Sequence, residues 1–129
     1  MRFDPIPANV ENVAKTCVDC GIHVHRELGP GFKEKIYERA FCLELDLRGV
    51  KFECERKILV RYKTWTIPGQ KIDLVVDGKV IVELKTVPRL KPLHTKQVLS
   101  YLKTMDLRLG LLMNFNTVLL KQGIKRVVL

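Results

Sequence analysis

Three ionic side chains interrupt two apolar, strand-like runs in the middle of the chain. Asp73 lies inside the run 72–76, Glu83 lies inside the run 80–84, and Lys85 follows that run directly. A carboxylate buried without a partner would cost several kcal/mol, so a compensating group must lie nearby, and a divalent cation is the obvious one. Carboxylates that hold a hard cation beside a lysine are suited to hydrolysis of phosphodiester bonds.

The spacing of these residues supports that chemistry. Glu83 and Lys85 are two positions apart, so in a strand they face the same side while Leu84 faces the other. The ammonium of Lys85 can then orient or deprotonate water and offset charge in the transition state. Asp73, on the preceding strand, is expected to supply the second carboxylate.

The turn between the two strands decides whether the carboxylates can meet. A two-residue loop, Asp77-Gly78, would place Asp73 and Glu83 on opposite faces of the sheet. A three-residue loop or a bulge, with Gly78 supplying the positive φ, brings them to one face, and we predict this longer turn. The alternative for these residues is an internal ion pair between Asp73 and Lys85, with Glu83 exposed at a strand end.

Periodicity and turn residues predict the elements that position this site. We expect helices over about 9–28, 33–48 and 93–107, and strands over 51–56, 58–62, 72–76, 80–86, 109–114 and 124–128. The second helix is expected to bury Ile36, Ala40, Leu43 and Leu47. The order ααββββαββ predicts the α/β class, with a mixed central sheet flanked by helices, in a single domain over 1–129.

Charge and hydropathy narrow the classes of partner. A formal charge of +9, from 23 Lys+Arg against 14 Asp+Glu, favours a polyanion such as nucleic acid, although many basic proteins bind none. The excess is pronounced after the candidate site, at Lys85, Arg89, Lys91, Lys96 and Lys103. No apolar run approaches the ~20 residues of a membrane span, and the first residues lack a signal-peptide core. We therefore expect a cytoplasmic protein with no membrane partner.

Two other residue types receive structural interpretations. All four cysteines lie in the first half, and Cys17-x-x-Cys20 falls in a helical pattern without a second pair, so reduced structural thiols are expected. Trp65, the only tryptophan, could stack on a base, but packing within a β-hairpin is the expected role.

Two further motifs lie on helices. Glu34 and Tyr37, in Gly31-x-x-Glu34-x-x-Tyr37, share one helical face, as do Gln97 and Tyr101. With these residues the chain closely resembles the GxxExxY family of the PD-(D/E)xK nuclease superfamily. The resemblance runs from about Val10 to Val128 and points to the RecB and lambda exonuclease-like branch.

The resemblance implies a restriction-endonuclease-like core and assigns a role to each motif residue. It implies that Mg²⁺ or Mn²⁺ is held by Glu34, Asp73, Glu83 and the backbone carbonyl of Leu84. Lys85 matches the catalytic lysine, and the substrate-positioning residues would be Gln97, Tyr101 and Tyr37. Ile72 takes the position of the proline in the PD-(D/E)xK motif. The carboxylate of Asp73, which carries the chemistry, is unaffected by this difference. The implied activity is hydrolysis of nucleic acid, with DNA favoured over RNA.

Other interpretations stay open at this point. Glu34 is favourable in a first helical turn through the helix dipole alone, and Tyr37 fits a core position. The main alternative to a nuclease is a non-catalytic nucleic-acid-binding or complex-assembly module that kept the fold. A chain of 129 residues has little room for a separate specificity domain, which favours a second copy or a partner protein as the source of selectivity.

Overall fold

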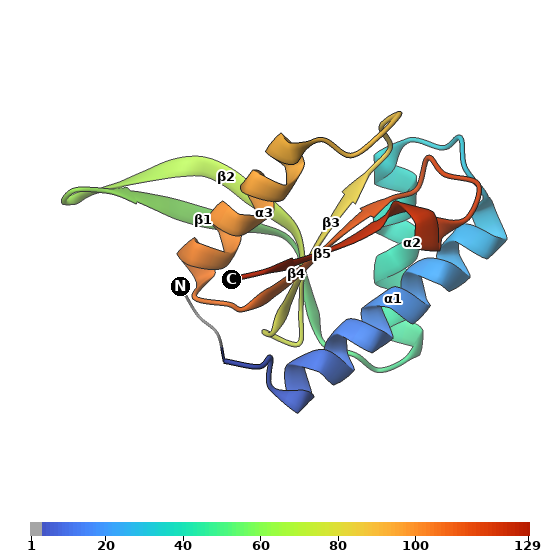
Figure 1. Ribbon diagram of the computed structural model, residues 1–129, viewed down its shortest axis with the longest axis horizontal. Helices are drawn as coiled ribbons and strands as arrows, with labels where there is room; N and C mark the ends of the chain where they lie inside the picture. Colours follow the sequence, from blue (N-terminus) through green and yellow to red (C-terminus); the bar gives the residue numbers. More distant parts are fainter. Residues whose placement is uncertain (1–3) are drawn as a thin grey trace.

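The computed structural model describes residues 4–129 as a five-stranded sheet with helices on both faces (Figure 1). In chain order the elements are α1 (Ala8–Leu28), α2 (Glu34–Leu47), β1 (Phe52–Tyr62), β2 (Trp65–Val76), β3 (Val80–Lys85), α3 (Pro92–Met105), β4 (Leu109–Asn114), the 3-10 helix η1 (Leu120–Gly123) and β5 (Ile124–Val128). The predicted fold class, a mixed sheet flanked by helices, is confirmed.

The strands lie in sequence order, β1-β2-β3-β4-β5. β3 and β4 are parallel and the other neighbours are antiparallel, with α3 as the crossover connection. The first two predicted strands are in fact one, so the observed order is ααβββαββ with η1 before the last strand. Glu55, with φ of 49°, distorts β1 near the predicted break, but pairing resumes at Arg56↔Ile72. The predicted break between residues 56 and 58 therefore corresponds to a local distortion within one strand.

Each face of the sheet has its own core. α1 and α2 pack on one face through residues such as Cys17, Phe41 and Leu45, and α3 packs on the other through Val98 and Leu102. All four cysteines are free thiols, as expected. None of the helices in residues 4–129 is long and apolar enough to cross a membrane.

The predicted buried face of α2 was wrong. Its buried residues are Tyr37, Glu38, Phe41 and Leu45, whereas Ile36 is 46% and Leu43 55% exposed. Two apolar stripes with helical spacing run along this helix, and periodicity cannot choose between them. The larger Tyr37 and Phe41 side chains face the sheet, since they bury more apolar area.

β1 and β2 continue beyond the sheet as a two-stranded arm (Figure 1). β2 pairs with β3 only over Leu74–Val76, and its earlier residues pair with β1 alone. The far end of the arm is closed by the pair Tyr62↔Trp65, next to Lys63 with φ of 54°. Trp65 lies in a β-hairpin, as expected, but it is 63% exposed, so little of this side chain is covered by packing.

Candidate active site

The candidate site lies at a fork in the sheet, where β2 leaves β3 to enter the arm. The loop between these strands has three residues, because Val76 pairs with Val80, and Asp77 and Gly78 both have positive φ. The predicted odd-length turn is therefore confirmed. The last pair between these strands is Leu74↔Val82. One residue further along the same register, Asp73 lies opposite Glu83, and the two side chains share one face of the sheet.

At the fork the two carboxylates replace the missing ladder hydrogen bonds. The backbone N–H of Asp73 donates to Oε1 of Glu83 at 2.9 Å, and the N–H of Leu84 donates to Oδ2 of Asp73 at 2.9 Å. Each carboxylate is thus fixed through one oxygen. Within residues 4–129 no hydrogen bond reaches Oδ1 of Asp73, and Oε2 of Glu83 has only the Lys85 ammonium nearby. One oxygen of each group is left to face a cation.

The backbone adds a further oxygen. The carbonyl of Lys85 accepts the N–H of Phe115, beyond the end of β4, so this carbonyl points towards β4. Along a strand the N–H and C=O of one residue point to one side, and those of the next residue to the other. Since the N–H of Leu84 bonds to Asp73, the Leu84 carbonyl also points into the fork.

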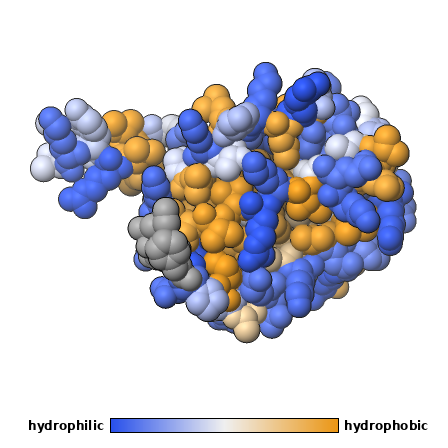
Figure 2. All heavy atoms as spheres, viewed as in Figure 1, coloured by the Kyte–Doolittle hydropathy of each residue, from blue (hydrophilic) through white to orange (hydrophobic). Residues whose placement is uncertain are grey.

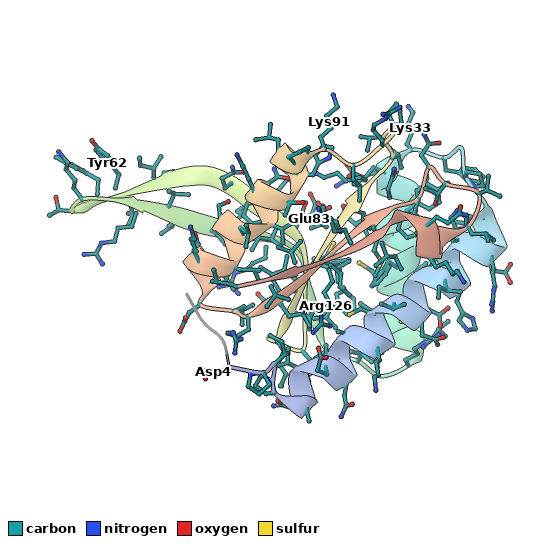
Figure 3. The ribbon with its side chains drawn as sticks, in the orientation of Figure 1. Asp4, Lys33, Tyr62, Glu83, Lys91 and Arg126 are labelled. Atoms are coloured by element: carbon teal, nitrogen blue, oxygen red, sulfur yellow. The ribbon has the colours of Figure 1, made fainter. Side chains whose placement is uncertain are left out.

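Lys85 and Gln97 meet beside these carboxylates. The Lys85 ammonium lies 3.7 Å from Oε2 of Glu83 and donates to Oε1 of Gln97 at 3.2 Å. Gln97 and Tyr101 lie one turn apart on α3, and the Tyr101 hydroxyl donates to Oε1 of Gln70 at 3.5 Å. Figure 3 shows Glu83 between β3 and α3. The structure therefore places Lys85, Gln97 and Tyr101 along one wall of the fork.

Glu34 reaches the site from α2 and is the first residue of that helix. It is half-buried, and its carboxyl pKa is raised, first by burial and then by the charge of Asp73, while Lys85 opposes the shift. The two carboxylates are thus close enough to interact. Glu34 still has exposed side-chain atoms, which leave it room to move.

Tyr37 does not serve the substrate-positioning role that the resemblance implied. Its side chain is fully buried and stacks on Phe115, with the ring centroids 4.6 Å apart. Its hydroxyl donates to the carbonyl of Gly29 and accepts the N–H of Phe32 at 3.1 Å. The hydroxyl proton is thus already engaged within the protein. Tyr37 instead anchors the loop that leads into α2, where Gly31, with φ of 112°, makes a bend that other residues rarely adopt. Through this loop the motif sets the position of Glu34.

Burial and like charges dominate the electrostatics. Burial raises the pKa of Glu83 to about 8, and the charges of Asp73 and Glu34 add to the shift. The Asp73 N–H and the Lys85 ammonium oppose it without cancelling it. The site thus holds more negative charge than its own lysine balances.

The alternative of an internal ion pair does not fit this geometry. Lys85 pairs with Glu83 and, within the described residues, makes no ion pair with Asp73. Glu83 is 3% exposed, not at an open strand end. A cation bound by the free oxygens of Asp73 and Glu83 and the Leu84 carbonyl meets only hard donors, which suits Mg²⁺ or Mn²⁺.

A second group of metal-capable side chains lies nearby, on α2 and β1. Ligand atoms of Glu38, Cys54 and Glu55 lie within 4.8 Å of one another, a criterion that no other group in residues 4–129 meets. Glu34, Asp73 and Glu83 are therefore spread more widely, and Glu34 must turn inward to share a cation. The tighter group is already neutralised, since Glu55 pairs with Lys35 at 2.9 Å and Lys71 at 2.6 Å. Two ammonium groups there oppose a cation, whereas at the fork only the Lys85 ammonium forms an ion pair with a carboxylate within the described residues.

Sequence reasoning missed two polar residues that shape the site. Asn114 is 2% exposed, and its side chain exchanges two hydrogen bonds with the backbone of Val87, which ties the segment after Lys85 to the end of β4. Its position as the one polar residue closing an apolar strand was an available signal. His94, in the first turn of α3, has a lowered pKa, first because of burial and then because of the charges of Lys85 and Lys91.

A sheet that forks at two carboxylates, with a lysine beside them and helices on both faces, defines a class of nuclease-like folds. The family model of the PD-(D/E)XK nuclease superfamily matches residues 11–127, nearly the whole chain. The chain belongs to this superfamily. No curated protein and no solved structure gives a significant match.

Proposed function

We propose that this protein is a metal-dependent nuclease of the GxxExxY type, within the RecB-like branch of its superfamily, and that it hydrolyses DNA in preference to RNA. The observation that carries the proposal is the fork, where Asp73 and Glu83 each accept a backbone N–H through one oxygen. The other oxygen makes no hydrogen bond within the described residues, and that of Glu83 lies 3.7 Å from the Lys85 ammonium. Within the described residues no buried side-chain oxygen lacks a hydrogen-bond partner, so the second oxygen of each carboxylate is open to solvent and accessible to a metal ion. Membership of the nuclease superfamily supports the same conclusion.

The donors suit one kind of cofactor. Asp73, Glu83, the Leu84 carbonyl and, after a side-chain rotation, Glu34 would hold Mg²⁺ or Mn²⁺, which when bound supplies a Lewis acid and an acidified water. The fixed oxygens of Asp73 and Glu83 keep this donor set rigid, because each is held by a backbone N–H.

The remaining residues act on water and phosphate. The Lys85 ammonium, held between Glu83 and Gln97, orients the attacking water and offsets charge on the phosphorane-like transition state. Gln97 fixes the direction of that ammonium. Tyr101, whose pKa is raised to about 12 mainly by burial and by the charges of Glu83 and Asp73, stays protonated and can donate to a phosphate oxygen.

Two basic residues precede the helices that carry Glu34 and Gln97. Lys33 precedes α2 and Lys91 precedes α3, and both lie at one edge of the molecule in Figure 3, above Glu83. Neither makes an ion pair within the described residues. With the net charge of +9, these cations favour a phosphate backbone as the ligand.

The decisive test is cleavage of labelled DNA with Mn²⁺, with and without chelator. Lys85→Met should lower the rate at least about a hundredfold, or ~2.7 kcal/mol in barrier, while the fold and metal binding persist. Lys79→Met, at the other end of β3, is the matched control and should cleave normally. A wild-type protein that binds DNA but never cuts it would instead support the non-catalytic binding or assembly module. Single-stranded, duplex and RNA substrates in parallel define the preference.

A further inference from the structure

The arm formed by β1 and β2 is longer than its pairing with the rest of the sheet requires, since β2 pairs with β3 only over Leu74–Val76. Beyond the fork it projects from the body, with Tyr62 near its far end (Figure 3). Tyr62 is 56% and Trp65 63% exposed, and both are large side chains that proteins normally cover. Two exposed aromatic residues on a ribbon that continues from the strand of Asp73 indicate a binding surface for a ligand.

Register separates the two faces of the arm. Tyr62 pairs with Trp65 and Val60 with Ile67, so these four side chains share one face. Arg61, paired with Thr66, lies on the other. Figure 2 shows a hydrophobic patch within the arm and hydrophilic residues around its tip. The arm therefore presents an aromatic and aliphatic strip edged by polar groups.

The charge of the arm has one sign. Residues 57–71 contain four basic residues and no acidic one: Lys57, Arg61, Lys63 and Lys71. Within the described residues, Lys57, Arg61 and Lys63 make no ion pair, and the Lys63 ammonium lies 5.4 Å from the centroid of the Tyr62 ring. Cations beside exposed aromatic rings are the elements of a single-strand binding surface, where bases stack and phosphates are neutralised. A second copy of the same arm would bring like charges together.

The arm also leads directly to the candidate active site. A groove of about 430 Å³ at its base is lined by residues 57–59 and 68–71. Gln70 lines this groove and accepts the hydroxyl of Tyr101, and three residues later β2 reaches Asp73 at the fork. β2 therefore connects the exposed arm, through this groove, to the carboxylates at the fork.

We propose that the arm binds unpaired nucleotides, with bases stacked on Tyr62 and Trp65 and phosphates on Arg61 and Lys63, and feeds this single strand to the fork. The proposal rests on the proposed function and specifies its substrate as nucleic acid with a single-stranded segment. Stacking on an exposed ring requires a base that is not already stacked and paired in a duplex.

The chain carries its own probe for this test, since Trp65 is the only tryptophan. In chelator, so that nothing is cleaved, titration with a short oligothymidylate should quench Trp65 emission saturably. A blunt hairpin duplex of equal charge should quench it far less. Equal quenching by both, or none by either, would overturn the proposal.

Variants then separate stacking from charge, with the affinity for a labelled oligothymidylate measured by anisotropy. Trp65→Ala should weaken binding about tenfold, and Trp65→Phe, which keeps a ring, by much less. The double variant Arg61→Ala, Lys63→Ala should make the logarithm of the affinity fall less steeply with the logarithm of the salt concentration, by the amount expected for the loss of about two phosphate contacts. Val118→Ala, at a residue 81% exposed outside the arm, is the control and should bind as wild type.

Two outcomes distinguish this inference from the proposed function. If wild type cleaves DNA and Trp65→Ala binds and cleaves equally well, the arm is not the strand-binding element, although the nuclease stands. If oligothymidylate quenches Trp65 but Mn²⁺ never yields cleavage, the arm binds as proposed and the nuclease fails. A concentration-dependent dimer in sedimentation that Trp65→Ala abolishes, with unchanged affinity for the oligonucleotide, would assign the arm to self-association and overturn the inference.

Discussion

At Glu83 the needs of folding and of chemistry conflict. The side chain is almost fully buried next to Asp73, and burial, followed by the charge of Asp73, raises its pKa to about 8, so the isolated site disfavours the ionised form. A cation needs the ionised form, so metal binding must release a proton. Ionisation of the buried Glu83 carboxyl is therefore coupled to the binding of a divalent ion.

This conflict predicts a pH dependence of stability in chelator. The folded-state pKa of Glu83 lies above its ordinary value of 4.5, so between about pH 4.5 and pH 8 the native state binds more protons than the unfolded state. Stability must therefore fall as pH rises through this window. Glu83→Gln keeps an acceptor for the Asp73 N–H but cannot ionise, so the stability difference between variant and wild type should grow with pH. Urea unfolding of both proteins at several pH values measures it, and parallel curves would contradict the assignment.

A substitution of Gln97 tests whether this side chain positions the Lys85 ammonium. Gln97→Ala removes the oxygen that holds the Lys85 ammonium but leaves every metal donor in place. We expect a loss of roughly tenfold in kcat, or ~1.4 kcal/mol, with little change in metal affinity. Thr104→Ala, two turns further along α3, controls for helix effects. A loss as large as that of Asp73→Ala would mean that Gln97 does more than orient the lysine.

At the scale of elements, local patterns predicted much of the arrangement. The strands 109–114 and 124–128 were placed correctly, because each is an apolar run bounded by clear breaks. The odd-length turn at Gly78 followed from requiring Asp73 and Glu83 to meet. The arm was missed because residues 65–71 contain Pro68 and Gly69, which normally end strands. Here the irregularity is absorbed as a register shift near Val60.

The buried face of α2 was not predictable from spacing, although the alternative of a core position for Tyr37 is confirmed. Both follow from which neighbours the sheet offers, such as Phe115 from a distant part of the chain. The position of Glu34 at the first turn of α2 was predicted, but its link to the Gly29–Phe32 loop through one hydroxyl was visible only in three dimensions.

That link predicts an effect on both stability and activity. Tyr37→Phe would leave the Gly29 carbonyl and the Phe32 N–H without their shared partner, at a cost of about 1–3 kcal/mol. The loosened loop should also misplace Glu34 and lower cleavage. Tyr62→Phe removes an exposed hydroxyl from the arm and should leave stability unchanged. Thermal unfolding and cleavage assays on the two variants measure the contrast, and equal behaviour would contradict the anchoring role.

At the scale of the whole molecule, the site joins elements that otherwise belong to separate cores. Glu34 comes from α2 on one face, Gln97 from α3 on the other, and Asp73 and Glu83 from the two strands between them. Three carboxylates and one ammonium thus lie around the fork, close enough for their charges to interact. Charge at the fork should therefore influence the stability of the entire fold.

Asp73→Asn provides the test. Asparagine can still accept the Leu84 N–H through its side-chain oxygen, while the change removes repulsion with Glu83 and Glu34. In chelator the variant should therefore melt at the same temperature as wild type or higher. Added Mn²⁺ should raise the Tm of wild type by mass action, and that of Asp73→Asn much less. If Asp73 were instead a structural partner of Lys85, the change would strand a buried ammonium and cost about 3–5 kcal/mol. A variant that melts markedly earlier in chelator, with Mn²⁺ protecting neither protein, would show that these carboxylates serve the fold and not a metal.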